Sequence, residues 1–269
     1  MLSYQIHLNK NGDPMKYIKN FFEQFIILIQ FMTRIPIPLK TSYSEKKLGK
    51  SIKFFPLVGL IIGLILYFTN FLIITYLKNF FYNKTIIAIF LIILEILIVG
   101  IIHIDGLADT FDGLFCYAKK EKMLEIMKDS RIGTNGAVIL ILYFITKTVL
   151  TSEIIMINPK YLIICPIIAR LSTPINAGLS DYARKSGMSN AIISENGIFE
   201  AIFSLALSTI LVFYIIDIKG IITIFIAFIF IIIFMLNVRK KIDGITGDTM
   251  GACLELTSIL VLFLGIVLR

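Results

Sequence analysis

The chain has 269 residues, of which 57% are hydrophobic and 16% charged, and its formal net charge is +8. A mean hydropathy of +0.88 places it among polytopic membrane proteins and excludes an ordinary soluble domain. Its three cysteines lie far apart without a paired spacing, which argues against both a disulfide framework and a zinc site.

In chain order, the first apolar segment is too short to cross a membrane. Residues 21–31 are apolar but include Glu23, Gln24 and Gln30, so we expect an interfacial or re-entrant helix there. Later runs reach the length of about 20 residues that a spanning helix needs. These runs cover residues 52–77, 84–102, 137–157, 160–179, 197–216, 219–238 and 250–268.

The runs together predict an all-α fold, a polytopic integral membrane helical bundle of about seven transmembrane helices. We expect residues 1–269 to form a single membrane-embedded domain, with residues 1–14 as a peripheral N-terminal extension.

The basic residues are distributed unevenly between the two sides of the predicted bundle. With a cytoplasmic N-terminus, most of them fall on the cytoplasmic side, and the other side carries Lys78, Lys84, Lys160, Lys219 and Arg269. This asymmetry follows the positive-inside rule and predicts a multi-pass protein of the cell membrane whose acidic motifs face the cytoplasm. The positive charge then needs no nucleic acid partner, although part of it can attract anionic substrates or lipid headgroups of the bilayer.

Residues 103–113 place three carboxylates at the end of an apolar run. On a helix, Asp105, Asp109 and Asp112 are spaced i, i+4 and i+7 and project from one face. Three anions so close repel one another unless a cation holds them, and oxygen ligands alone suit Mg²⁺ or Mn²⁺ better than zinc or copper. The alternative is that these aspartates simply face water.

Residues 127–136 combine an acid, a base and two glycines just before a predicted span. Backbone N–H groups in such a turn can bind phosphate at the N-terminus of the following helix, with Arg131 as a bidentate clamp. The alternative interpretation is a turn held by a contact between Asp129 and Arg131.

Residues 243–251 lead into the last span and contain Asp248 between two glycines. Gly247 and Gly251 form a small-xxx-small pair that predicts close approach of another helix. Packing explains the glycines but not Asp248, which we therefore expect in a functional site.

Two arginines complete the set of candidate residues. Arg170 interrupts the span 160–179, and Arg184 lies on the loop that follows it. A buried arginine in a membrane helix needs an anion, unless its side chain reaches the interface. Carboxylates for a divalent metal and arginines for phosphate at one membrane face favour a metal-dependent transferase acting on a phosphate ester or anhydride.

Six short motifs follow one another over nearly the whole chain: Thr33-Arg-Ile-Pro, Phe55-Pro-Leu-Val-Gly, His103-Ile-Asp-Gly-Leu-Ala-Asp-Thr-Phe-Asp-Gly, Met127-Lys-Asp-Ser-Arg-Ile-Gly, Tyr182-Ala-Arg-Lys-Ser-Gly-Met and Gly247-Asp-Thr-Met-Gly-Ala. In this order they closely resemble the adenosylcobinamide-GDP ribazoletransferase family, also called cobalamin synthase. Asn135 departs from the pattern in one turn, and the residues before about Met15 are unmatched.

The resemblance implies the last assembly step of the cobalamin nucleotide loop. Adenosylcobinamide-GDP and α-ribazole or its 5′-phosphate would be joined to give adenosylcobalamin or its 5′-phosphate, with loss of GMP. It leaves open a homo-oligomer or an association with other enzymes of corrinoid assembly.

Residue roles follow from the same resemblance. Asp105, Asp109, Asp112 and Asp248 are expected to hold Mg²⁺, or Mn²⁺, against the diphosphate. Asp109, Asp248 and Arg131 are the expected catalytic residues. Substrate binding is assigned to Arg34, Asp129, Arg131, Gly133, Arg170 and Arg184.

Two alternative classes remain at this point. The spacing of Asp105 and Asp109 also resembles the aspartate-rich motifs of CDP-alcohol phosphotransferases and of membrane prenyltransferases, although Asp109 replaces the arginine expected after Ala108 in the former. An ion-coupled transporter is less favoured, because its ionisable groups should lie near the middle of the bilayer rather than at one face.

Overall fold

A computed structural model describes residues 14–77, 83–184, 187 and 189–269. Within these residues the structure is helical apart from loops and an isolated bridge between Tyr182 and Ile245, which confirms the predicted all-α class. The helices are α1 (Pro14–Met32), α2 (Glu45–Ser51), η1 (Ile52–Phe54), α3 (Phe55–Tyr76), α4 (Lys84–Val99), α5 (Ile102–Leu114), α6 (Lys120–Ile126), α7 (Thr134–Ile157), α8 (Tyr161–Leu179), α9 (Asn190–Ser194), α10 (Ile198–Ile216), α11 (Ile218–Ile242) and α12 (Gly247–Val267).

Among the described residues, 6 helices are long and apolar enough to cross a membrane, and α4 and α5 together add another. This result confirms the predicted bundle of about seven spans and a multi-pass membrane protein. The six are Glu45–Tyr76, Thr134–Ile157, Tyr161–Leu179, Ile198–Ile216, Ile218–Ile242 and Gly247–Val267.

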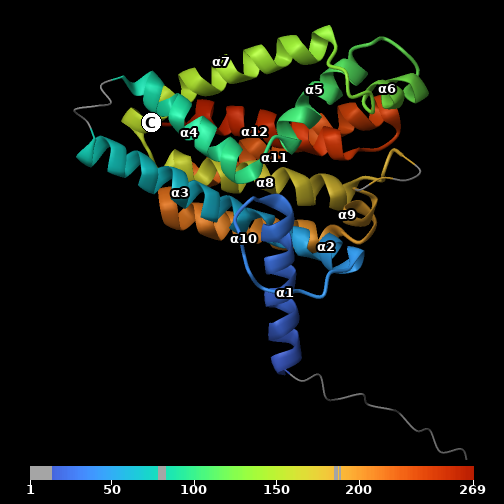
Figure 1. Cartoon of the computed structure of the whole chain (residues 1–269), viewed down its shortest axis with the longest axis horizontal. Helices are drawn as coiled ribbons and strands as arrows, with labels where there is room; N and C mark the ends of the chain where they lie inside the picture. Colours follow the sequence, from blue (N-terminus) through green and yellow to red (C-terminus); the bar gives the residue numbers. More distant parts are fainter. Residues whose placement is uncertain (1–13, 78–82, 185–186, 188) are drawn as a thin grey trace, which may run out of the picture.

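The second predicted span, 84–102, is not one straight helix. α4 ends at Val99, and α5 leaves it at an angle of 95°. Gly100, between them, has a φ of 85°, a backbone conformation that glycine adopts without strain. The bend gives α5 a direction of its own, so α5 does not continue along the axis of α4 (Figure 1).

α8 forms the centre of the bundle and packs against α3, α10, α11 and α12 (Figure 1). Its contact with α3 is close because two residues of α3 lack side chains. A Cβ at Gly59 would lie 2.3 Å from the carbonyl oxygen of Pro166, and one at Gly63 would lie 2.6 Å from that of Ile163. Small residues at such positions let membrane helices approach until their backbones touch.

Charged side chains lie between α4, α7 and α12 in the interior. Lys147 is 8% exposed, and its Nζ lies 2.9 Å from a carboxylate oxygen of Glu95 and 3.6 Å from one of Glu255. Tyr143 accepts a 2.7 Å hydrogen bond from Lys147 and donates one to Glu255. Because buried charges in a membrane need partners, this interior ion network links three helices that are distant in sequence.

α1 is longer than the apolar segment 21–31 that predicts it, and it projects from one side of the bundle (Figure 1). Phe21 packs against Phe54 with ring centroids 4.4 Å apart, and Glu23 pairs with Lys47 at 2.7 Å. An interfacial or re-entrant position for α1 stays a prediction. The proposed extension, residues 1–14, lies outside the described residues except for Pro14.

Candidate active site

The N-terminal halves of α5 and α12 lie against each other with almost no space between their backbones. A Cβ at Gly106 would lie 2.8 Å from the carbonyl oxygen of Asp248, and one at Gly251 would lie 3.1 Å from the Cα of His103. The close helix contact predicted from Gly251 is therefore present, whereas Gly247 faces the side chain of Ser189 instead. This contact brings the first acidic motif beside Asp248.

Asp105 and Asp109 form the open part of the acidic face of α5. Both belong to one uninterrupted helix, as their spacing predicts, and Asp105 is exposed while Asp109 is partly exposed. Neither carboxylate accepts a hydrogen bond from any described residue. The charges of Asp105, Asp112 and Asp248 all act on Asp109, opposed by that of Arg184. Asp105 and Asp109, which lack hydrogen-bond partners among the described residues, form a pair of anions that attracts a cation or a hydrogen-bond donor.

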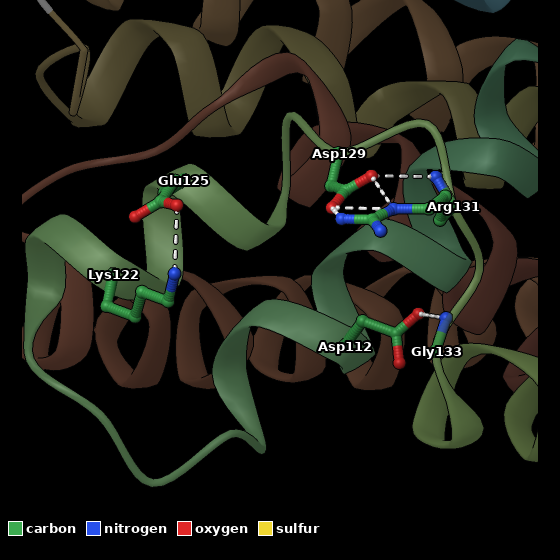
Figure 2. A network of polar contacts seen from close by, with 6 residues as sticks. All are labelled: Asp112, Lys122, Glu125, Asp129, Arg131 and Gly133. Atoms are coloured by element: carbon green, nitrogen blue, oxygen red, sulfur yellow. Dashed lines mark hydrogen bonds and ion pairs between the residues drawn. The ribbon is translucent and has the colours of Figure 1, made fainter.

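Asp112 has a different environment, at the N-terminus of α7. Its Oδ2 accepts a 2.7 Å hydrogen bond from the backbone N–H of Gly133, and its Oδ1 accepts a 2.8 Å bond from that of Gly136 (Figure 2 shows the first). A carboxylate is favourable there because the first N–H groups of a helix lack partners and the helix dipole is positive. The backbone N–H groups that were expected to bind substrate phosphate therefore bind the Asp112 carboxylate instead. The N–H group of Gly133, a predicted substrate-binding residue, is one of them.

Asp129 and Arg131 also pair with each other. Arg131 Nη2 lies 2.6 Å from Asp129 Oδ2, and the backbone N–H of Arg131 donates to Asp129 Oδ1 at 3.0 Å (Figure 2). These bonds from Arg131 lower the pKa of Asp129 to about 2. The Arg131 side chain is 87% exposed. The turn interpretation of this motif is therefore the one observed, with a guanidinium that remains open to solvent.

Asp248 and Arg184 form an ion pair whose charges both act on Asp109 of the acidic face of α5. Arg184 Nη2 donates to Asp248 Oδ2 at 2.7 Å, and Thr246 caps α12 by accepting from the backbone N–H of Thr249. In the described residues the protein bonds to Asp248 all use Oδ2, which leaves Oδ1 open. Sequence reasoning placed both residues in the site, but not their pairing.

A cavity of about 320 Å³ opens beside this ion pair. His103, Lys128 and Tyr182 line it together with Arg184 and Asp248. Sequence reasoning assigned no role to Lys128 or His103, although they lie within the 127–136 and 103–113 motifs. His103 lines the cavity together with Asp248 and Gly251 of α12, the helix that packs against this side of α5. The remaining wall is mostly apolar and includes Phe31, Met32, Ile102, Ile192 and Met250.

Two predicted substrate-binding arginines lie apart from this cavity. Arg34 is exposed near the α4–α5 bend, where a Cβ at Gly100 would lie 3.4 Å from its Nε. Arg170 is 2% exposed inside the bundle, lies 5.7 Å from the ring centroid of Phe55, and donates to the carbonyl oxygen of Pro166. The structure therefore does not bring Arg170 to the acidic face, and a substrate role for either arginine stays a prediction.

The residues can be tested for their fit to a divalent metal ion. Among the described residues, no three His, Cys, Asp or Glu side chains lie close enough together to hold one metal ion. Asp112 is bound to α7 and Asp248 to Arg184, whereas Asp105 and Asp109 remain open. Mg²⁺ is commonly bound by one or two carboxylates with substrate phosphates completing its shell. Asp105 and Asp109 thus fit an Mg²⁺ ion whose remaining ligands come from a bound diphosphate. They do not form a site in which the protein alone supplies all the ligands.

Comparison with known proteins shows the family to which the chain belongs. Residues 24–266 match the family model described as cobalamin-5-phosphate synthase. The adenosylcobinamide-GDP ribazoletransferase of Fusobacterium nucleatum is 40% identical over 91% of this chain and 97% of its own length. The protein of the same name from Clostridioides difficile is 38% identical over 89% of this chain and 95% of its own length. No solved structure matches the chain. The chain belongs to the cobalamin-5-phosphate synthase family.

Proposed function

We propose that this protein joins adenosylcobinamide-GDP to α-ribazole or α-ribazole 5′-phosphate, giving adenosylcobalamin or its 5′-phosphate and GMP. The observation that carries the proposal is that Asp109, an open carboxylate next to Asp105, lies near enough to Asp248 and Arg184 for their charges to act on it. Asp248 and Arg184 in turn line a cavity together with Lys128. Anions that can share a metal with a diphosphate and cations that can bind phosphate oxygens then lie together. The relatives named adenosylcobinamide-GDP ribazoletransferase match this chain over about nine tenths of its length, which supports the same reaction.

In this proposal Asp105 and Asp109 would hold Mg²⁺, or Mn²⁺, on the acidic face of α5. The ion would supply positive charge to the diphosphate as its bridging bond breaks. Asp112 would support this face from its fixed position at α7, without binding the ion directly.

The protein side chains would position the reacting groups. A ribose hydroxyl of α-ribazole attacks the phosphorus nearer cobinamide; an O–P bond forms while the bond to the GMP oxygen breaks. The hydroxyl proton passes to Oδ1 of Asp248, which is open while Oδ2 binds Arg184. Arg184 and Lys128, which line the cavity, would bind the phosphate oxygens, and the exposed Arg131 would steady the leaving GMP phosphate.

We further propose that the site lies at the cytoplasmic face of the cell membrane. The support is the excess of lysine and arginine in the segments that contain the site motifs. Soluble nucleotide substrates are available on that side.

The proposed function is tested by measuring GMP release from adenosylcobinamide-GDP and α-ribazole 5′-phosphate by the purified full chain in detergent. We expect release with Mg²⁺, none with EDTA, and a loss of at least about 100-fold in kcat for Asp109→Asn. Asp217→Asn, which removes the same charge between α10 and α11, serves as the control and should keep full activity. Substantial activity of Asp109→Asn would remove this residue from the metal site, and no GMP from folded wild type would reject the reaction.

A further inference from the structure

A second, polar cavity lies next to the cavity of the Asp248–Arg184 pair. Its volume is about 590 Å³, and its wall comes from the C-terminal end of α8, the following loop, and α9. Tyr182 lines both cavities, and α9 separates them: Ile192 faces the first cavity, whereas Ile193 faces the second. The volume lies within the range of roughly 300–1,000 Å³ that is common for small-molecule sites.

The two cavities differ in the chemistry of their walls. The polar cavity is lined by Ser180, Asp181, Asn190, Ser194 and Asn196, whereas much of the first cavity is apolar. The two bases in the proposed reaction differ in the same way. Guanine has N1–H and a 2-amino group as donors and O6 and N7 as acceptors, while a methylated benzimidazole offers mainly apolar surface. The polar cavity therefore matches guanine, and the apolar wall matches the base of α-ribazole.

Oxygen atoms at this wall lack hydrogen-bond donors within the described part of the chain. Asn196 is 8% exposed, and its Nδ2 donates to the carbonyl oxygen of Pro174 at 3.0 Å. That bond fixes the amide and leaves its Oδ1 as an unpartnered buried acceptor, and the buried Oγ of Ser180 is also unpartnered. Asp181 adds an exposed carboxylate with no side-chain partner among the described residues. Asn196 Oδ1 and Ser180 Oγ are thus unpartnered acceptors buried in the wall, and the Asp181 carboxylate is the exposed acceptor that suits a ligand with N–H donors.

We propose that this polar cavity binds the guanine base of the GDP group, with the Asp181 carboxylate accepting hydrogen bonds from N1–H and from the 2-amino group. The inference rests on the proposed function. It places the nucleotide across Tyr182, with the base in the polar cavity and the diphosphate beside Arg184. The loop from Asp181 to Arg184 then contacts both ends of the nucleotide.

The test compares the binding of GMP, IMP and AMP to the full chain in detergent by titration calorimetry. IMP lacks the 2-amino group, so wild type should bind GMP about tenfold more tightly than IMP, the worth of one such hydrogen bond. Asp181→Asn should lose this preference. Asp217→Asn, a matched charge removal outside the cavity, should keep it. A GMP preference that survives in Asp181→Asn, or no GMP binding by wild type, would overturn the assignment.

Turnover separates this inference from the proposed reaction. Asp181→Asn should raise KM for adenosylcobinamide-GDP about tenfold and leave KM for α-ribazole 5′-phosphate unchanged. A rise in KM for the ribazole substrate alone would assign the cavity to the other base and reject the guanine site. Selective GMP binding without any turnover would retain the guanine site while rejecting the reaction.

Discussion

The position of Asp112 allows a structural role to be separated from metal binding. Replacing it by Asn keeps one acceptor but removes the negative charge and one of the bonds, of 2.7 and 2.8 Å, to the N–H groups that begin α7. Loss of a charged hydrogen bond and of a helix-end charge should lower the free energy of unfolding by about 1.5–3 kcal/mol. The Mg²⁺ concentration that gives half-maximal GMP release should not change, because both Asp112 oxygens are held at the N-terminus of α7 by the N–H groups of Gly133 and Gly136.

Two measurements on the same preparations check this prediction. Thermal unfolding of the full chain in detergent should show Asp112→Asn melting below wild type, and a Mg²⁺ titration of GMP release should superimpose on that of wild type. A normal melting temperature together with a tenfold higher Mg²⁺ requirement would refute the reasoning and make Asp112 a metal ligand.

A double-mutant cycle tests the contact itself. A Cβ at Gly136 would lie 2.3 Å from Asp112 Oδ2, so Gly136→Ala should displace the carboxylate. Once the carboxylate is displaced, its bonds to the α7 N–H groups are already weakened, so Asp112→Asn costs less additional free energy of unfolding. The two losses of unfolding free energy should then fall short of additivity by about 0.5–3 kcal/mol, and full additivity would show that the residues act independently.

Three further predictions concern other parts of the molecule. Lys147→Met should destabilise the protein by about 3–5 kcal/mol, because Glu95 and Glu255 would lose their buried partner; an unchanged melting temperature in detergent would argue against the network. Gly106→Ala should reduce kcat about 100-fold by separating α5 from α12, whereas Gly197→Ala, where the nearest atom to a Cβ is 3.5 Å away, should not. The Asp129–Arg131 pair contributes to stability above pH 3.8, the ordinary pKa of Asp, and this contribution is lost as the pH falls to about 2. Because Asp129 stays ionised above about pH 5, Asp129→Asn should leave the shape of the pH–rate profile there unchanged.

Hydropathy and helical spacing predicted the parts of this structure that depend on local sequence. The spans were recognisable because a bilayer demands long apolar helices, and the shared face of Asp105 and Asp109 follows from the helical repeat. The bend at Gly100 was missed because the apolar run continues across it, with Ile101 and Ile102 both exposed on the surface of the bundle.

The partners of the polar residues could not be predicted in the same way. Spacing on α5 gives Asp112 a direction, but only tertiary packing brings the N-terminus of α7 to that side chain. Likewise, His103 reaches the cavity because α12 packs against the opposite side of α5. The sequence predicts that Arg170, as a buried charge, needs an anion. Its contact with the ring of Phe55 depends on tertiary packing and could not be predicted.

The interior ion network has a consequence for how the chain is assembled in the membrane. Glu95, Lys147 and Glu255 belong to helices that are synthesised in that order, and a lone charge at a helix centre costs about 2.5–3.5 kcal/mol on insertion. Glu95 and Lys147 can pair as soon as α4 and α7 meet. Glu255 gains Lys147 and Tyr143 as partners only when α12 enters the bundle. The network therefore favours an order of assembly in which α4 and α7 pair first, and the arrival of α12 then brings Asp248 beside α5.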